Sequence, residues 1–164
     1  MHRRLNTADI NAAAQTAVTA VLALLLARLC QLPESFWAPI SAIVCSLDAF
    51  DGALRVGRRR FLGTALGVTI GALQMSLTTH SLLSYSFVIA LLGLVCSGLS
   101  LHPSAFRFGA IALTVVVTDT SNPNIWITAA TRFVDVSLGI LVALIVGRAW
   151  PMKPHREEIP PNPE

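Results

Sequence analysis

Two stretches of this chain, 72 residues apart, resemble each other. Arg60–Phe61, followed by Gly67, reappears as Arg132–Phe133, followed by Gly139. The surrounding strings RRRFLGTALGVTIGAL (58–73) and TRFVDVSLGILVALI (131–145) agree in the same register. Each copy reads as a short apolar segment, a charged stretch and a long glycine-rich apolar helix. A repeat of this kind in an apolar chain is typical of a membrane transport module.

The apolar character of the chain predicts an all-α, polytopic membrane protein. Charged residues make up 13% of the sequence, whereas a soluble domain carries about 25%. Crossing the hydrocarbon takes roughly 20 residues of helix, and six apolar runs alternate with charged clusters. Two of the runs, 36–47 and 108–117, are short for a span. We expect six transmembrane helices, near 12–31, 35–48, 61–78, 82–101, 105–118 and 133–150.

These spans predict a single integral membrane domain over residues 1–151. The first span is expected to stay uncleaved, because residues 27–30 lack the small residues of a signal-peptide cleavage site. Residues 152–164 are rich in proline and charge and are predicted to be a disordered tail. Cys30, Cys45 and Cys96 lie in or beside apolar segments without a CxxC spacing, so we interpret them as small buried hydrophobes.

Basic residues set the predicted orientation. With a cytoplasmic N-terminus, the inside segments carry ten arginines and lysines, whereas only Arg28 and Arg132 fall outside. The positive-inside rule therefore places both termini in the cytoplasm. The spans of each copy are odd in number, so the two copies enter the membrane in opposite directions as inverted repeats. Such repeats place their substrate site near the midplane, at paired short or interrupted segments; here these are 35–48 and 105–118.

Small residues recur every four positions along two of the long spans. In a bilayer, such stripes let helix backbones approach closely where lipid gives no hydrophobic drive between helices. We interpret the stripes as packing surfaces, against either this chain or a second subunit. Their members are Gly63, Gly67 and Gly71 in one copy and Gly139, Ala143 and Gly147 in the other.

The quoted segments resemble the fusaric-acid-resistance-like family of aromatic acid exporters. The string FWAPIS at 36–41 is similar to the family's second span, and RFLGTALG at 60–67 to its R-x-x-G-T-x-x-G segment. The stretch from Arg132 to Pro151 resembles its closing helix, and the match covers about residues 12–151. The resemblance implies efflux of aromatic or other organic carboxylates from a bacterial inner membrane. It also implies that a complete exporter assembles from two or more copies of this chain.

Seven residues are candidates for substrate binding or translocation. Ionisable groups within the membrane are costly and are a functional hypothesis by default. The candidates are Trp37, Asp48, Arg60, Thr64, Asp119, Arg132 and Asp135.

Several of these positions also have a plainer interpretation. The cluster Arg58–Arg60 fits a topology anchor that contacts lipid headgroups, with attraction of an anionic substrate as the alternative. The stretch around Asp119 fits a solvated external turn. Arg132 and Asp135 are three residues apart and could pair on one helix face.

The favoured function is an inner-membrane efflux module for organic carboxylates. The only lysine is Lys153, so a G-x-x-x-x-G-K-[ST] loop is absent, and coupling would come from protons or a partner. A non-transporting assembly subunit is the alternative, and a polar cavity between spans 2, 3, 5 and 6 would distinguish the two. The sequence contains neither an HExxH nor a GxSxG motif, so neither motif favours an enzyme. No cofactor, metal or nucleic acid is expected. The expected partners are the bilayer, a small organic anion and further copies in a dimer or larger homo-oligomer.

Overall fold

The computed structural model describes residues 7–46, 50–77, 81–119 and 124–150, and within these ranges it holds six α-helices and no strand. The all-α prediction is therefore confirmed. The predicted tail at 152–164 and the candidate Asp48 lie outside the described residues. The helices are α1 (Thr7–Leu29), α2 (Trp37–Ser46), α3 (Phe50–Leu77), α4 (Leu82–Gly98), α5 (Pro103–Thr118) and α6 (Ile125–Ala149).

Local sequence signals explain where several helices begin. The Ser81 side chain accepts a hydrogen bond from the Ser84 backbone N–H and so caps α4. Pro103 stands in the first turn of α5, where its missing N–H costs nothing. Asn124 caps α6 by accepting from the Trp126 N–H.

Helix α3 begins much earlier than the expected span at 61–78. It starts at Phe50 and carries the whole charged stretch around Arg55–Arg60 within its first turns. Arginine, alanine and leucine are good helix formers and this stretch holds no proline, so nothing stops the helix before the charges end. Arg60 is consequently an interior helix residue, and the expectation that it sits just before a long helix is wrong. The same correction applies to Arg132, because α6 begins at Ile125.

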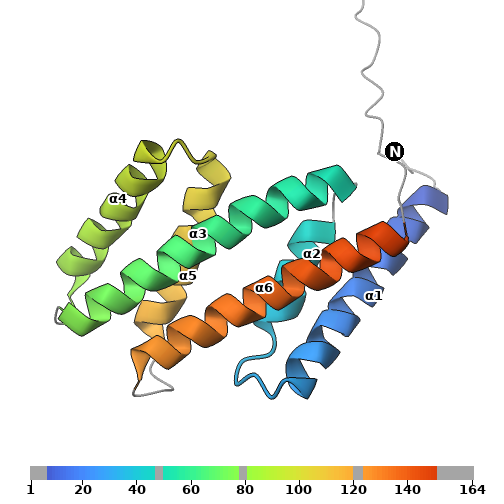
Figure 1. The fold of residues 1–164 in the computed structure, drawn as a ribbon, viewed down its shortest axis with the longest axis horizontal. Helices are drawn as coiled ribbons and strands as arrows, with labels where there is room; N and C mark the ends of the chain where they lie inside the picture. Colours follow the sequence, from blue (N-terminus) through green and yellow to red (C-terminus); the bar gives the residue numbers. More distant parts are fainter. Residues whose placement is uncertain (1–6, 47–49, 78–80, 120–123, 151–164) are drawn as a thin grey trace, which may run out of the picture.

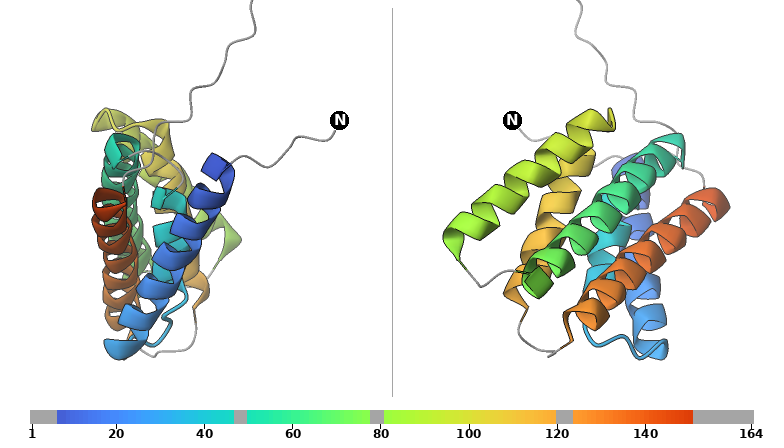
Figure 2. Two further views of the ribbon diagram at one scale, coloured as in Figure 1. Left: turned by 90° about the vertical axis from the view of Figure 1, so that its right-hand side faces the viewer. Right: turned by 60° about the vertical axis from the view of Figure 1, so that its left-hand side comes forward.

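The helices contact one another in matching pairs (Figure 1). Helices α3 and α6 lie side by side and antiparallel across one face, with α5 packed on α3 and α2 packed on α6 (Figures 1 and 2). Helix α1 packs on α2 and α6, and α4 packs on α5 and α3 at the opposite edge. Exchanging α1 with α4, α2 with α5 and α3 with α6 leaves this set of contacts unchanged.

Glycines hold the main helix pairs at backbone contact. A Cβ at Gly63 would overlap the carbonyl oxygen of Ala105, and a Cβ at Gly67 would overlap that of Gly109, both on α5. On α6, a Cβ at Gly139 would overlap the Ala38 carbonyl of α2. The partner helices of these glycines therefore belong to the same chain.

Other members of the two stripes pack less tightly. A Cβ at Gly71 would stand 3.4 Å from Leu113, and one at Gly147 would meet only the Phe50 ring at 3.9 Å. Ala143 is buried among alanines of α1 and α2, including Ala23 and Ala38. The closest backbone contacts thus lie in the earlier part of each stripe, at Gly63 and Gly67 on α3 and at Gly139 on α6.

Large apolar side chains point outward from the peripheral helices. On α4, Leu82, Leu83 and Leu94 are 85%, 84% and 72% exposed. By length and composition, the segments Asp9–Leu29 and Ile125–Ala149 are long and apolar enough to cross a membrane; α2, α4 and α5 are apolar but shorter. Cys45 and Cys96 are buried as expected, whereas the expectation for Cys30 is wrong, since it is exposed just after α1.

Replacing Gly67 by alanine should destabilise the protein by about 1–3 kcal/mol, because the added methyl group would collide with rigid backbone of α5. The matched control is Gly147→Ala, which adds the same methyl group where only the Phe50 ring is near. Thermal unfolding of both variants in detergent measures the difference. Equal midpoints would contradict the close contact between α3 and α5.

Candidate functional site

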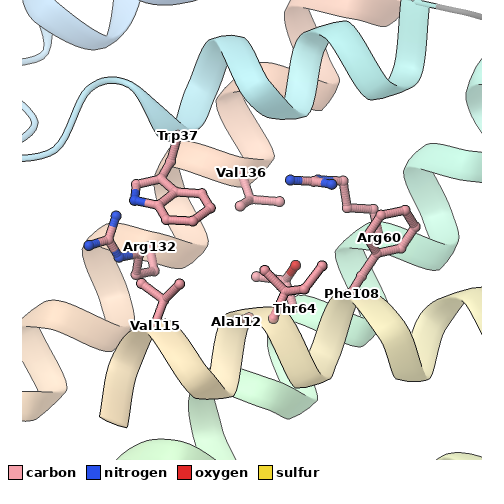
Figure 3. Close-up of a pocket in the computed structure, with 9 residues that line it drawn as sticks. Trp37, Arg60, Thr64, Phe108, Ala112, Val115, Arg132 and Val136 are labelled. Atoms are coloured by element: carbon pink, nitrogen blue, oxygen red, sulfur yellow. The ribbon is translucent and has the colours of Figure 1, made fainter. Parts of the chain in front are cut away.

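A small cavity lies between α2, α3, α5 and α6, the four helices in the middle of the contact pattern (Figure 3). Its volume is about 20 Å³, which is room for about one water molecule. Two arginines and two aromatic rings face it, at opposite ends, with small side chains between (Figure 3). The lining residues are Trp37, Arg60, Thr64, Phe108, Ile111, Ala112, Val115, Arg132 and Val136.

At one end, Arg60 projects from the interior of α3 and is 6% exposed. Its Nε donates a hydrogen bond to Ser41 Oγ at 3.2 Å, and its guanidinium lies 4.8 Å from the centre of the Phe108 ring. No carboxylate within the described residues is at ion-pair distance from it. A serine hydroxyl and an aromatic face thus contact this buried cation. Arg58, in contrast, is exposed, so the arginine cluster divides between the interior and the surface.

At the other end, Arg132 projects from α6 and is 5% exposed. Its Nη2 donates to Glu34 Oε2 and, at 3.2 Å, to Asp119 Oδ2. The guanidinium also lies 4.9 Å from the centre of the Trp37 ring, whose Nε1 donates to Glu34 Oε2 at 3.3 Å. Three side chains, those of Glu34, Trp37 and Asp119, therefore close this end around a single cation.

Two of the sequence expectations change here. Arg132 does not pair with Asp135 but with Glu34 and Asp119, because these carboxylates reach it from the α1–α2 connection and the end of α5. Asp119 is correspondingly no solvated turn residue, since its side chain is only 9% exposed. Asp135 is fully buried, and neither of its carboxyl oxygens has a hydrogen-bond partner within the part of the chain that is described.

The structure brings four of the seven candidates to one cavity: Trp37, Arg60, Thr64 and Arg132. Asp119 joins them through its ion pair, Asp135 lies on α6 one turn beyond Arg132, and Asp48 is outside the described residues.

Sequence reasoning missed Glu34, Ser41 and Phe108. Glu34 had a usable signal, because Arg132 is an outer basic residue that breaks the charge bias and Glu34 is an acid on that same predicted side. Ser41 lay within the string that resembles the family's second span. Phe108 gave no local signal, since its role depends on the contact between α3 and α5.

The arrangement is suited to binding a small anion with an aromatic part. A guanidinium offers a planar pair of donors that matches a carboxylate, and the flanking rings offer stacking surfaces. In the described conformation, however, about 20 Å³ is far below the about 300–1,000 Å³ of pockets that hold small organic ligands. Such an anion therefore needs the helices around the cavity to separate. No group of three His, Cys, Asp or Glu side chains that could hold a metal occurs in the described ranges.

Comparisons with known proteins find one matching family and one similar membrane protein. The family profile described as fusaric acid resistance protein-like matches residues 20–146. The chain is also 26% identical over 141 residues to the inner membrane protein YeeA of Escherichia coli. That match covers 85% of this chain but 40% of the relative, so the chain spans well under half the relative's length. No solved structure matches the chain.

Replacing Arg132 by methionine should destabilise the protein more than removing the whole ion-pair cluster does. The single change leaves two adjacent carboxylates without their cation; breaking a fully buried pair costs about 3–5 kcal/mol, and less is expected here because Glu34 keeps 26% exposure. In the triple variant Arg132→Met, Glu34→Gln, Asp119→Asn, part of the stability should return.

Thermal midpoints in detergent compare these two variants, and Arg28→Met, at an exposed arginine, controls for loss of charge alone. A triple variant less stable than the single one would show that the carboxylates stabilise the fold without Arg132.

Proposed function

This chain belongs to the fusaric acid resistance protein-like family, and on that premise we propose that it is an inner-membrane module that exports aromatic or other organic carboxylates. The family and the inner-membrane relative support a membrane-transport role. The observation that carries the proposed substrate class is the pair of buried arginines at repeat-equivalent positions, which line one cavity. Arg60 and Arg132 each face an aromatic ring of the neighbouring helix, Phe108 and Trp37.

The chemistry of this cavity favours an organic anion over a cation or a neutral solute. Arg60 has no carboxylate partner among the described residues, so its positive charge is available to a ligand. A substrate carboxylate reaching Arg60 would form a bidentate pair of charge-assisted hydrogen bonds in a poorly hydrated setting, where such bonds are strongest. Phe108 stands where the ring of an aromatic acid would stack.

We propose that the module is built from two inverted repeats, α1–α3 and α4–α6, spanning the membrane six times within residues 1–151. The unchanged contact pattern on exchanging the halves supports this arrangement. So does the direct contact of repeat counterparts Phe61 and Phe133, whose ring centres are 4.9 Å apart. Residues related by a two-fold axis meet only on that axis, and the antiparallel course of α3 and α6 fits an axis in the membrane plane (Figure 1).

The two ends of the cavity suggest how transport would be gated. In the proposed topology, with both termini cytoplasmic, Glu34, Asp119 and Arg132 lie on the outer side. This ion-pair cluster would keep the outer end closed, and a substrate carboxylate that competes for Arg132 would loosen it. Asp135 is the proposed proton carrier, because it is fully buried one turn from Arg132 and no hydrogen bond fixes its carboxyl oxygens among the described residues.

A non-transporting assembly subunit remains the second candidate, and the small volume of the cavity favours it. A packing subunit needs a filled interior, and a cavity of about 20 Å³ leaves the interior of this chain nearly filled. The two candidates differ in whether the cavity opens. Measured transport of a carboxylate would show that it does. The expected dimer or larger homo-oligomer stays a prediction that the particle mass in detergent tests.

Cys30 offers a direct test of the topology, because it is exposed while Cys45 and Cys96 are buried. A membrane-impermeant maleimide should label Cys30 from outside intact cells. In a Cys30→Ser background, Ser100→Cys, at an exposed position of the α4–α5 connection, should be labelled only after the membrane is opened. The opposite labelling pattern would invert the proposed orientation, and labelling of both positions from one side would rule out six spans.

Arg60→Ala and Arg132→Ala should each reduce export of an aromatic carboxylate such as benzoate, and the lysine replacements should reduce it less. Lysine keeps the charge but loses the planar fork; loss of one charged hydrogen bond of about 1.5–3 kcal/mol corresponds to roughly a 10- to 150-fold weaker interaction. Arg107→Ala is the matched control, since it removes an exposed arginine outside the cavity. The measurement is efflux of the labelled acid from cells with equal amounts of each variant in the membrane. Export at the parental rate by both alanine variants would favour the assembly subunit.

A further inference from the structure

Helices α3 and α6 run side by side (Figure 1), and two apolar grooves are lined by residues of both helices. Their volumes are about 260 and 270 Å³, more than ten times that of the central cavity. The first, the Arg58 groove, is lined by Leu54, Gly57, Arg58, Phe61, Leu62, Ile140 and Leu144. The second, the Ala130 groove, is lined by Ala65, Val68, Thr69, Trp126, Ala129, Ala130 and Phe133.

The grooves correspond to each other through the internal repeat. Four α3 residues of the Arg58 groove have their counterparts, 72 positions on, in the Ala130 groove. Val68 and Ile140 correspond in the same way from the opposite helices. The four pairs are Leu54 with Trp126, Gly57 with Ala129, Arg58 with Ala130 and Phe61 with Phe133. The two grooves therefore share a position in the repeat and differ in one charge, that of Arg58.

We propose that the Arg58 groove binds one anionic phospholipid, with the phosphate at Arg58 and an acyl chain along the groove. Arg58 is exposed, and Arg55 and Arg59 on the same helix add positive charge beside it. Arginine matches a phosphate with two parallel hydrogen bonds. Further along the groove, Phe61 and Leu62 are 41% and 42% exposed and offer an apolar track for the chain.

A lipid fits this face better than a second copy of the protein does. In a membrane dimer the two-fold axis runs along the membrane normal, so a residue and its equivalent in the other copy lie at the same depth. A dimer through this face would therefore bring Arg58 and its neighbours to the same level as the equivalent arginines of the other copy, and like charges across an interface repel. A phosphate in the groove neutralises this charge instead.

The test is retention of phosphatidylglycerol by the full chain, measured by native mass spectrometry from detergent, with phosphatidylcholine as the uncharged comparison. The parent should retain a single phosphatidylglycerol and Arg58→Ala should bind it about fivefold more weakly. Ala130→Arg should gain a second phosphatidylglycerol, because it places the same charge in the equivalent groove. Arg107→Ala, at an exposed arginine outside both grooves, should bind like the parent.

Equal retention by the parent and Arg58→Ala would overturn the proposal, as would equal retention of the two lipids. A dimer that dissociates in Arg58→Ala while lipid retention stays unchanged would assign the face to a second copy and overturn it as well. Because the readout is lipid mass, the result is independent of whether the chain transports carboxylates.

Discussion

Backbone contact at glycine is the interaction on which the rest of the structure depends. Gly63 and Gly67 let α3 touch α5, and Gly139 lets α6 touch α2, so the four central helices form two tight pairs. The aromatic residues under the arginines are direct neighbours of these contact points: Phe108 precedes Gly109, and Trp37 precedes Ala38. A bulkier residue at either glycine would separate the pair and withdraw the ring from its guanidinium. The close helix packing therefore also fixes the electrostatics of the candidate site. This explains why a stripe of small residues runs beside the buried charges.

The two halves share their pattern of helix contacts and differ in their charges. Arg60 and Arg132 occupy equivalent positions and both stack on aromatic rings, yet Arg132 is paired with two carboxylates and Arg60 bonds to a serine. The same kind of difference occurs on the face formed by α3 and α6, where Arg58 corresponds to Ala130. Buried charge is expensive unless it is paired, so Arg60, which has no carboxylate partner among the described residues, has a cost that packing alone does not explain. A carboxylate ligand at Arg60 is the occupant that the proposed function supplies, and in that proposal the asymmetric pair would give the two sides of the membrane different affinities for it.

Much of the candidate site followed from sequence because the arginines and Trp37 are rare residue types in apolar surroundings. Of the residues that were missed, Ser41 and Phe108 are ordinary in their local context, and only the contact between helices gives them a role. The predicted Arg132–Asp135 pair is wrong because spacing on one helix says nothing of partners on other segments. Arg132 forms its ion pair with Glu34 instead. The expected span at 61–78 begins later than α3 because the charged stretch before it interrupts the apolar pattern, although its residues favour helix once one face of it, including Arg60, is buried.

The sequence by itself determined the helical class, the membrane-protein family and the repeat, because hydrophobic runs and small-residue spacing are local patterns that survive without knowledge of neighbours. It also determined which charges were unusual. Only the tertiary structure decided which charges meet: that Glu34 and Asp119 close on Arg132, that Arg60 reaches Ser41, and that Asp135 is buried without a hydrogen-bonded partner among the described residues. The physical reason is that such contacts join segments up to 98 residues apart, and their geometry depends on how closely the helix backbones approach.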